Sequence, residues 1–153
     1  MLAQIPVTSC ITSAAVFASP AKDLPPRVGK HALRVLVVDD EPLVRWAIAE
    51  TLSLEGYEVD EAGDADSTIH ALCTAASLPD IVLLDLRLPD CGDLTLLERV
   101  RLLAPAAVVI LMTAYGTAAV REHARSLGAA LVLDKPFDVD GLQGLISRLR
   151  RRQ

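Results

Sequence analysis

Short, uninterrupted apolar runs constrain the fold of this chain more than any other feature of its sequence. Four of them, each three to five residues long, lie at 35–38, 81–84, 108–112 and 131–133. Runs of this length are typical of strands covered on both faces, as in a parallel sheet. An alternating stretch at 57–61 predicts one further strand. All of these runs end well short of the ~18 residues that a membrane-spanning helix needs.

Helix-length segments separate the apolar runs. Pro42 suits the first turn of the first helix, and Gly56 suits its end. Asp64 or Asp66 can cap the second helix, whose expected buried stripe is Ile69, Leu72, Cys73 and Ala76. Three more helices are expected near 94–103, near 117–127 and from about 138 to the basic C-terminal end. Five such units predict an α/β fold: a single doubly wound, five-stranded parallel sheet with helices on both faces.

Composition and charge narrow the class of protein. The chain has 153 residues, of which 52% are hydrophobic, enough for one domain with a sizeable core. Its net charge of −5 argues against nucleic acid as the main partner. Three cysteines without metal-ligand spacing suit a reducing compartment. We therefore expect a cytoplasmic protein that has no membrane partner.

The N-terminal region differs from the rest of the chain. It begins with a mildly apolar stretch and continues into "PAKDLPPRVGK", which contains three prolines and one glycine. The missing basic start argues against a secretory signal. We predict a flexible tail or linker at 1–32 and one folded domain at 33–153.

Each strong apolar run is followed by a polar residue that can do chemistry. In chain order these residues are Asp39 and Asp40, then Asp85, Thr113 and Lys135. The carboxyl ends of parallel strands share one edge of a sheet, where ligands bind, so we expect these side chains to meet there. Each residue taken alone also has an ordinary interpretation, because acids at strand ends cap helices and lysines are mostly solvated.

Carboxylates brought together repel one another. At ~4 Å and an effective dielectric near ~20, each pair costs about 4 kcal/mol. Bound protons or a hard divalent cation relieve this repulsion, and Mg²⁺ suits an open, hydrated site with few carboxylates. A cation beside a carboxylate also suits phosphoryl transfer, in which the carboxylate attacks phosphorus to give an acyl phosphate.

Four motifs taken together resemble one known family. "VLVVDDEP", "IVLLDLRLP", "VILMTAYG" and "LDKPF" are similar to the receiver domain of two-component response regulators, over residues 34 to about 150. "MTAYG" and "RWAI" are most similar to receivers of the nitrogen-regulation type of transcriptional activator. The resemblance implies a flavodoxin-like sheet with strand order 2-1-3-4-5.

The resemblance also implies a phosphoacceptor and a metal site. Asp85 matches the phosphoacceptor of the family. Asp40 matches a direct ligand of Mg²⁺ (or Mn²⁺), and Asp39 matches its water-mediated companion. The complete set of implied metal ligands is Asp39, Asp40, Asp85 and the backbone carbonyl of Arg87.

Two further matches concern the response to phosphorylation and the docking of the partner. Thr113 and Lys135 match the pair that responds to the phosphoryl group. Lys135–Pro136 is a cis bond in many relatives, and Pro136 is one expected partner contact. Relatives dock a histidine kinase or a histidine phosphotransfer protein through the first helix. Trp46 lies off the buried stripe of that helix and is a second expected contact, although packing against a neighbouring helix is the alternative.

The function implied by the resemblance is that of a switch in a His–Asp phosphorelay. Phosphorylation shifts a pre-existing equilibrium on the face formed by the fourth helix, the fifth strand and the fifth helix. That face then binds a downstream protein target or a second copy of the chain. Such a domain is regulatory rather than a metabolic enzyme, although it assists its own phosphorylation and the loss of its phosphoryl group.

Two positions depart from the family pattern. Val132 stands where relatives usually carry Tyr or Phe, so the aromatic half of the switch is missing. Asp93 stands where glycine is usual, and Gly92 comes one position early. We regard Val132, Arg87 and Tyr115 as candidate modulators, and Tyr115 in particular as a shield of the phosphoryl group against water.

Two other functions stay open. A receiver without the aromatic residue can be degenerate and act as a non-switching scaffold for protein interactions. An aspartyl-phosphate hydrolase of the haloacid dehalogenase type needs a second Asp two residues after its nucleophile, where this chain has Arg87. A nucleotide-binding module is disfavoured because no glycine-rich loop follows the first strand.

Overall fold

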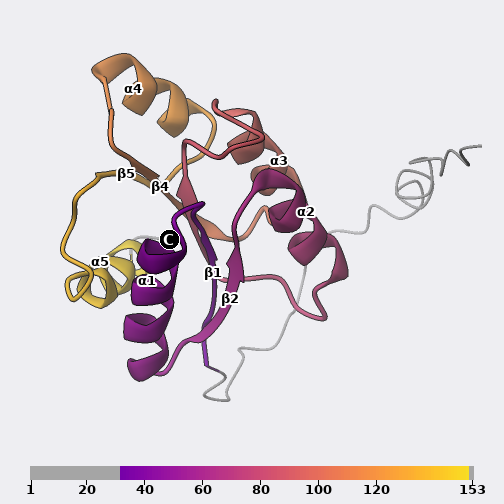
Figure 1. Cartoon of the computed structure of the whole chain (residues 1–153), viewed down its shortest axis with the longest axis vertical. Coiled ribbons are helices and arrows are strands. Elements are labelled where there is room, and N and C mark those ends of the chain that lie inside the picture. Colours follow the sequence, from indigo (N-terminus) through magenta and orange to yellow (C-terminus); the bar gives the residue numbers. More distant parts are fainter. Residues whose placement is uncertain (1–31, 152–153) are drawn as a thin grey trace, which may run out of the picture. The chain divides into compact units, whose positions relative to one another are not determined.

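The computed structural model describes residues 32–151, and the tail predicted at 1–32 lies outside the described residues apart from Ala32. Five strands and five helices alternate along the described part (Figure 1). Their bounds are β1 (Arg34–Val38), α1 (Pro42–Leu54), β2 (Glu58–Ala62), α2 (Ala65–Thr74), β3 (Ile81–Asp85), α3 (Thr95–Leu103), β4 (Val108–Thr113), α4 (Ala118–Ser126), β5 (Leu131–Asp134) and α5 (Leu142–Arg150).

The strands form one sheet in the order β2-β1-β3-β4-β5, and all neighbouring pairs are parallel. The predicted fold class and strand order are therefore confirmed. The order reverses direction between β1 and β3, which is the place where ligands bind in open α/β sheets. Within residues 32–151, no helix combines the length and the apolar character needed to cross a bilayer.

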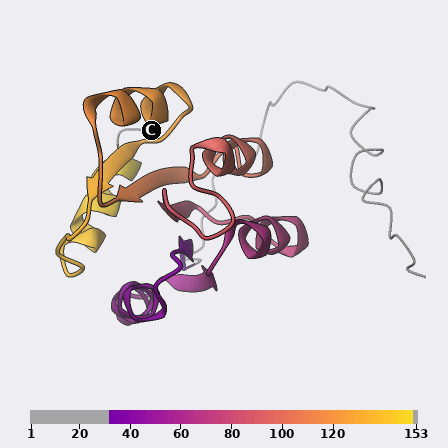
Figure 2. The same ribbon diagram turned by 45° about the horizontal axis from the view of Figure 1, so that its top comes forward.

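Helices cover both faces of the sheet (Figure 2). On one face, Val35 and Val37 of β1 pack in a core shared with α1 and α5. On the other face, Leu36 and Val38 pack in a core shared with α2, α3 and α4. The central strands read as unbroken apolar runs because both of their faces are buried. The edge strand β2 has a mostly exposed sequence, which explains its alternating pattern.

The helix ends follow the expected chemistry at most positions. Pro42 opens α1, and Gly56 follows its end with φ +88°, a conformation that glycine adopts without strain. Asp64 caps α2: its carboxylate accepts a hydrogen bond from the Ser67 N–H at 2.6 Å. The Ser67 hydroxyl in turn accepts from the Asp64 N–H, which completes a capping box.

Two predictions about helices were wrong. The buried residues of α2 are Ala65, Thr68 and Leu72, whereas Cys73 is exposed and Ala76 lies beyond the helix. The buried face of α2 therefore follows positions 65, 68 and 72, and Cys73 lies outside it. The fifth helix begins at Leu142 rather than near 138, because the Gly141 N–H bonds to the Asp138 carbonyl and closes a turn first.

Candidate functional site

Three carboxylates meet at the carboxyl ends of β1 and β3. One oxygen from each of Asp39, Asp40 and Asp85 lies within 4.8 Å of the others. The register explains this convergence, because Val38 pairs with Leu84 and the next residue on each strand is an acid. Asp39 and Asp85 are buried, with 0% and 7% of their surface exposed, while Asp40 is exposed. The doublet thus presents one carboxylate to the interior and one to solvent.

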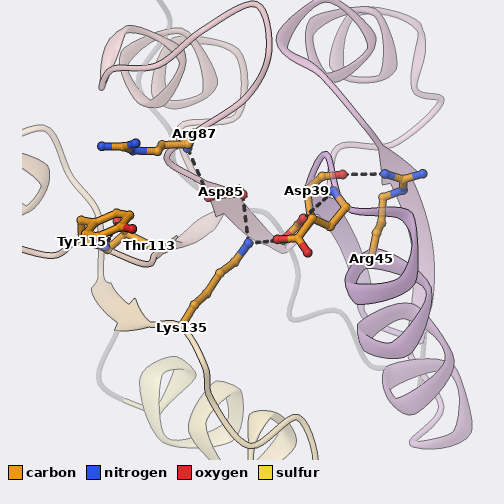
Figure 3. A network of polar contacts seen from close by, with 8 residues as sticks. Asp39, Arg45, Asp85, Arg87, Thr113, Tyr115 and Lys135 are labelled. Carbon is orange, nitrogen blue, oxygen red and sulfur yellow. Dashed lines mark hydrogen bonds and ion pairs between the residues drawn. The ribbon is translucent and has the colours of Figure 1, made fainter.

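Lys135 places a single cation against the two buried acids. Its Nζ lies 2.6 Å from Asp39 Oδ2 and 2.9 Å from Asp85 Oδ2 (Figure 3). The Lys135 N–H donates to the Thr113 carbonyl at 2.8 Å, which fixes the start of the side chain beside the end of β4. The Lys135–Pro136 bond is cis, as the resemblance implied.

The ionisation of the site follows from burial opposed by charge. Burial raises the pKa of Asp85, and the hydrogen bonds from Lys135 and the Arg87 N–H oppose but do not cancel this rise. Burial alone would lower the pKa of Lys135, but the hydrogen bonds to Asp39 and Asp85 outweigh it and raise that pKa. The lysine is therefore held as a cation. The hydrogen bonds to Asp85 do not fully offset the free-energy cost of burying its negative charge.

Local hydrogen bonds orient the side chains at the three strand ends. Asp39 Oδ1 accepts from the Glu41 N–H at 2.9 Å, and Asp85 Oδ1 accepts from the Arg87 N–H at 3.2 Å. Thr113 is buried, and its Oγ1 accepts from the Tyr115 N–H at 3.1 Å. The threonine hydroxyl can still donate its own proton to an acceptor that enters the site.

The residues singled out as modulators lie in different environments. Arg87 and Tyr115 are exposed, and the Arg87 guanidinium lies 4.9 Å from the centroid of the Tyr115 ring, a cation–π contact between the loops after β3 and β4. Val132 is buried in β5, where it pairs with Leu111. Asp93, which stands at the usual glycine position, accepts a hydrogen bond from the Thr95 N–H at 2.9 Å. Hydrogen bonding from the Thr95 side chain, and next from this N–H, lowers the pKa of Asp93.

The two candidate partner contacts lie at the surface. Trp46 on α1 is 60% exposed, so it is available to a partner rather than packed in the core. Pro136 is exposed and lines an apolar groove of about 510 Å³ beside Lys135. Its apolar lining from α1 and from the segment after β5 includes Leu43, Val44, Ala47, Phe137 and Val139.

Two arginines near the site were not found by sequence reasoning. Arg45 Nη1 donates to the Asp39 carbonyl at 2.5 Å, and Arg45 Nε pairs with Glu61 Oε2 at 3.2 Å, so α1 is tied to the turn that carries the acids (Figure 3). Arg121 on α4 binds the loop after β4 and strand β5. The acceptors of both arginines include backbone carbonyls, which no sequence motif marks.

The donor set fits a hard divalent cation. Every candidate ligand atom is an oxygen, and three carboxylates face one ammonium, so negative charge remains at the site. No residue within 32–151 gives the Asp40 carboxylate a hydrogen bond or an ion pair. Asp40 is exposed beside two buried acids, an arrangement that suits a largely hydrated Mg²⁺.

Comparison with known proteins agrees with this geometry. A family model described as the response regulator receiver domain matches residues 35–147. Sporulation initiation phosphotransferase F of Bacillus subtilis (strain 168) is 30% identical over 115 residues, which are 75% of this chain and 91% of the relative. The DNA-binding transcriptional regulator NtrC of Proteus hauseri is 35% identical over 114 residues, which are 74% of this chain and 24% of the regulator.

A solved structure is also similar to this chain. A response regulator protein from Burkholderia pseudomallei, crystallised with a phosphorylated aspartic acid, a calcium ion and citrate, is similar with a TM-score of 0.67 and 26% identity. The match covers 78% of this chain and 72% of that one. The similarity to NtrC confirms the predicted likeness to nitrogen-regulation-type receivers. The chain spans less than a third of the length of that regulator. On these grounds the chain belongs to the response regulator receiver domain family of two-component systems.

Proposed function

We propose that the chain accepts a phosphoryl group on Asp85 and passes this signal on through a change of conformation. The observation that carries the proposal is the convergence of three carboxylates with Lys135 held against two of them. A carboxylate can act as the nucleophile toward phosphorus, and the Lys135 cation beside Asp85 can offset part of the negative charge that the incoming group brings.

The donor in this proposal is the phosphohistidine of a histidine kinase or a histidine phosphotransfer protein. An Asp85 carboxylate oxygen forms a bond to phosphorus while the bond between phosphorus and the donor's imidazole nitrogen breaks. The imidazole leaves and takes up a proton from solvent, and Asp85 becomes an acyl phosphate. Asp39, Asp40, Asp85 and the backbone carbonyl of Arg87 would hold Mg²⁺. The bound ion would offset the negative charge of the phosphoryl oxygens.

Lys135 and Thr113 respond to the new group. Phosphorylation adds negative charge and oxygen acceptors, and Lys135 Nζ already lies 2.9 Å from one carboxylate oxygen of Asp85. The Thr113 hydroxyl donates to a phosphoryl oxygen, and the loop after β4 moves with it. The face formed by α4, β5 and α5 then shifts its equilibrium and binds a downstream protein or a second copy of the chain.

Support for these details comes from the relatives and from the surface. The Burkholderia protein carries a phosphorylated aspartic acid and a metal ion, and the Bacillus relative is named a phosphotransferase. Exposed Trp46 on α1 and the apolar groove lined by Pro136 and Lys135 offer surfaces that a donor protein can contact. The free thiols Cys73 and Cys91 suit the reducing cytoplasm, where we place the protein.

The proposal is tested by replacing the acceptor. Asp85→Asn should abolish incorporation of acid-labile phosphate from acetyl phosphate in the presence of Mg²⁺. The matched control is Asp93→Asn, which alters an exposed carboxylate in the loop after β3 and should leave incorporation intact. Retained incorporation in Asp85→Asn would contradict the assignment of the acceptor. Turnover of a generic phosphate ester would instead favour a hydrolase.

A second function is favoured by one observation. Val132 is buried in β5 and has no aromatic ring that could change position, which suits a scaffold that does not switch. Amide NMR distinguishes the two functions, because a switching receiver should shift its resonances across residues 113–140 when beryllofluoride and Mg²⁺ are added. Resonances that stay in place would favour the scaffold.

A further inference from the structure

A single guanidinium joins three neighbouring parts of the fold: α4, the loop after β4, and β5. Arg121 Nε donates to the Gly116 carbonyl at 3.1 Å, and Arg121 Nη1 donates to the Val132 carbonyl at 3.2 Å. The third nitrogen, Nη2, pairs with the Asp134 carboxylate. We call the set of Arg121, Gly116 and Asp134 the Arg121 latch.

The Arg121 latch lies next to both phosphoryl-responsive residues. Gly116 comes three residues after Thr113, and Asp134 directly precedes Lys135. Thr113 pairs with Asp134 in the register of β4 and β5. Any movement of Thr113 or Lys135 toward a group on Asp85 therefore displaces the loop after β4 or the end of β5, which Arg121 holds together.

The geometry of the latch allows one arrangement of these segments. A guanidinium is planar and carries its donors in a rigid fork, so it satisfies acceptors on two segments at a single relative position. Gly116 is what permits the close approach: a Cβ at this position would lie 2.7 Å from Asp134 Oδ1 and 3.0 Å from Arg121 Nη2. In the structure all three contacts are made, and we call this arrangement the closed latch.

We propose that the Arg121 latch holds the loop after β4 against β5 in the unphosphorylated state and opens on phosphorylation. It would thereby couple Asp85 to the face formed by α4 and β5 in a chain whose position 132 has no aromatic ring. This inference rests on the proposed function. The Arg121 and Asp134 side chains are 27% and 58% exposed, so the latch contributes little to overall stability and acts on the balance between two conformations.

The test measures beryllofluoride binding in the presence of Mg²⁺ by amide NMR, with four proteins of full length. Arg121→Met removes the cation. Gly116→Ala leaves the charge unaltered and places a Cβ against Asp134 and Arg121, and also 3.2 Å from the Thr113 methyl. Both should bind beryllofluoride about fivefold more tightly than wild type, since an exposed ion pair that stabilises only the unbound conformation is lost. Arg125→Met, which removes an exposed arginine from the same helix, should leave the affinity unchanged.

A double-mutant cycle of Arg121→Met with Asp134→Asn gives a second, independent readout. The free energy of unfolding should show coupling between the two positions without beryllofluoride and none with it. Unchanged affinity in both latch variants, or equal coupling in both states, would overturn the latch while the proposed function stands. If wild type itself does not respond to beryllofluoride, the proposed function fails and the latch with it.

Discussion

Lys135→Met isolates the cation that holds the acidic cluster together. The substitution keeps a long unbranched side chain and removes only the charge. In the wild type, 14% of the Lys135 side chain is exposed, against 0% for Asp39 and 7% for Asp85. Removing one partner of a buried ion pair costs about 3–5 kcal/mol, because the remaining charge is left uncompensated. Proton uptake by Asp85 offsets part of this cost, so we expect a loss of about 3 kcal/mol in the free energy of unfolding near neutral pH.

The loss should depend on pH in a defined direction. Burial raises the pKa of Asp85, and Lys135 opposes that rise, so the pKa climbs further in the variant. A group whose pKa is raised by folding contributes stability below its unfolded pKa and loses it as pH rises through its folded pKa. The loss in unfolding free energy caused by Lys135→Met should therefore be largest at neutral pH. It should decrease as the pH falls through the pKa of Asp85 in the folded variant.

Mg²⁺ should narrow the same deficit. The Lys135 ammonium occupies the space between Asp39 and Asp85 and competes with any other cation there. The variant should bind Mg²⁺ more tightly than wild type, and a ligand at a hundredfold excess over its Kd stabilises a fold by about 2.7 kcal/mol. Addition of Mg²⁺ should therefore raise the unfolding free energy of the variant more than that of wild type.

Urea unfolding followed by far-UV circular dichroism measures these effects, with and without Mg²⁺. Equal slopes for all proteins would show that only stability has changed. Lys135→Arg keeps the charge and serves as the control, with a smaller loss expected. The reasoning is refuted if Lys135→Met unfolds at the same urea concentration as wild type at neutral pH, or if Mg²⁺ widens the difference.

Three further substitutions test separate parts of the structure. Asp85→Asn should raise the urea midpoint at neutral pH, because burial raises the pKa of this acid. The gain in stability should vanish as the pH falls through that pKa. A midpoint below that of wild type would contradict the burial argument. Leu83→Ala removes a fully buried side chain from the core shared with α1 and α5, so it should lower the free energy of unfolding by about 3 kcal/mol. A decrease of less than about 1 kcal/mol in urea unfolding would contradict this expectation. Trp46→Ala should change the unfolding free energy by no more than about 0.5 kcal/mol but should slow phosphotransfer from a partner; unaltered transfer rates would exclude Trp46 from the docking surface.

Local pattern was sufficient to predict the sheet and the place of the acids. A strand buried on both faces must be apolar throughout, so 81–84 and 108–112 could be recognised without knowledge of their neighbours. Parallel strands bring their carboxyl ends to one edge, and that topological rule brought Asp85 beside the acidic doublet.

Helix faces were predicted less well, because the face that is buried depends on what lies opposite. Cys73 fits an amphipathic stripe on α2, but the buried face of that helix runs through Ala65, Thr68 and Leu72, and Cys73 lies outside it and is exposed. Likewise Asp138 could start a helix by its chemistry, but the turn closed between Asp138 and Gly141 delays α5 to Leu142.

The sequence by itself determined the α/β architecture and the chemical class of the residues at the strand ends, because both depend on short-range periodicity and on the polarity of single side chains. Only the tertiary structure decided which of those groups are partners. Lys135 pairs with Asp39 across 96 positions, and Arg121 finds its acceptors in a loop and in β5. Such pairs depend on the register between elements that fold separately along the chain, and that register is set by the packing of the whole core.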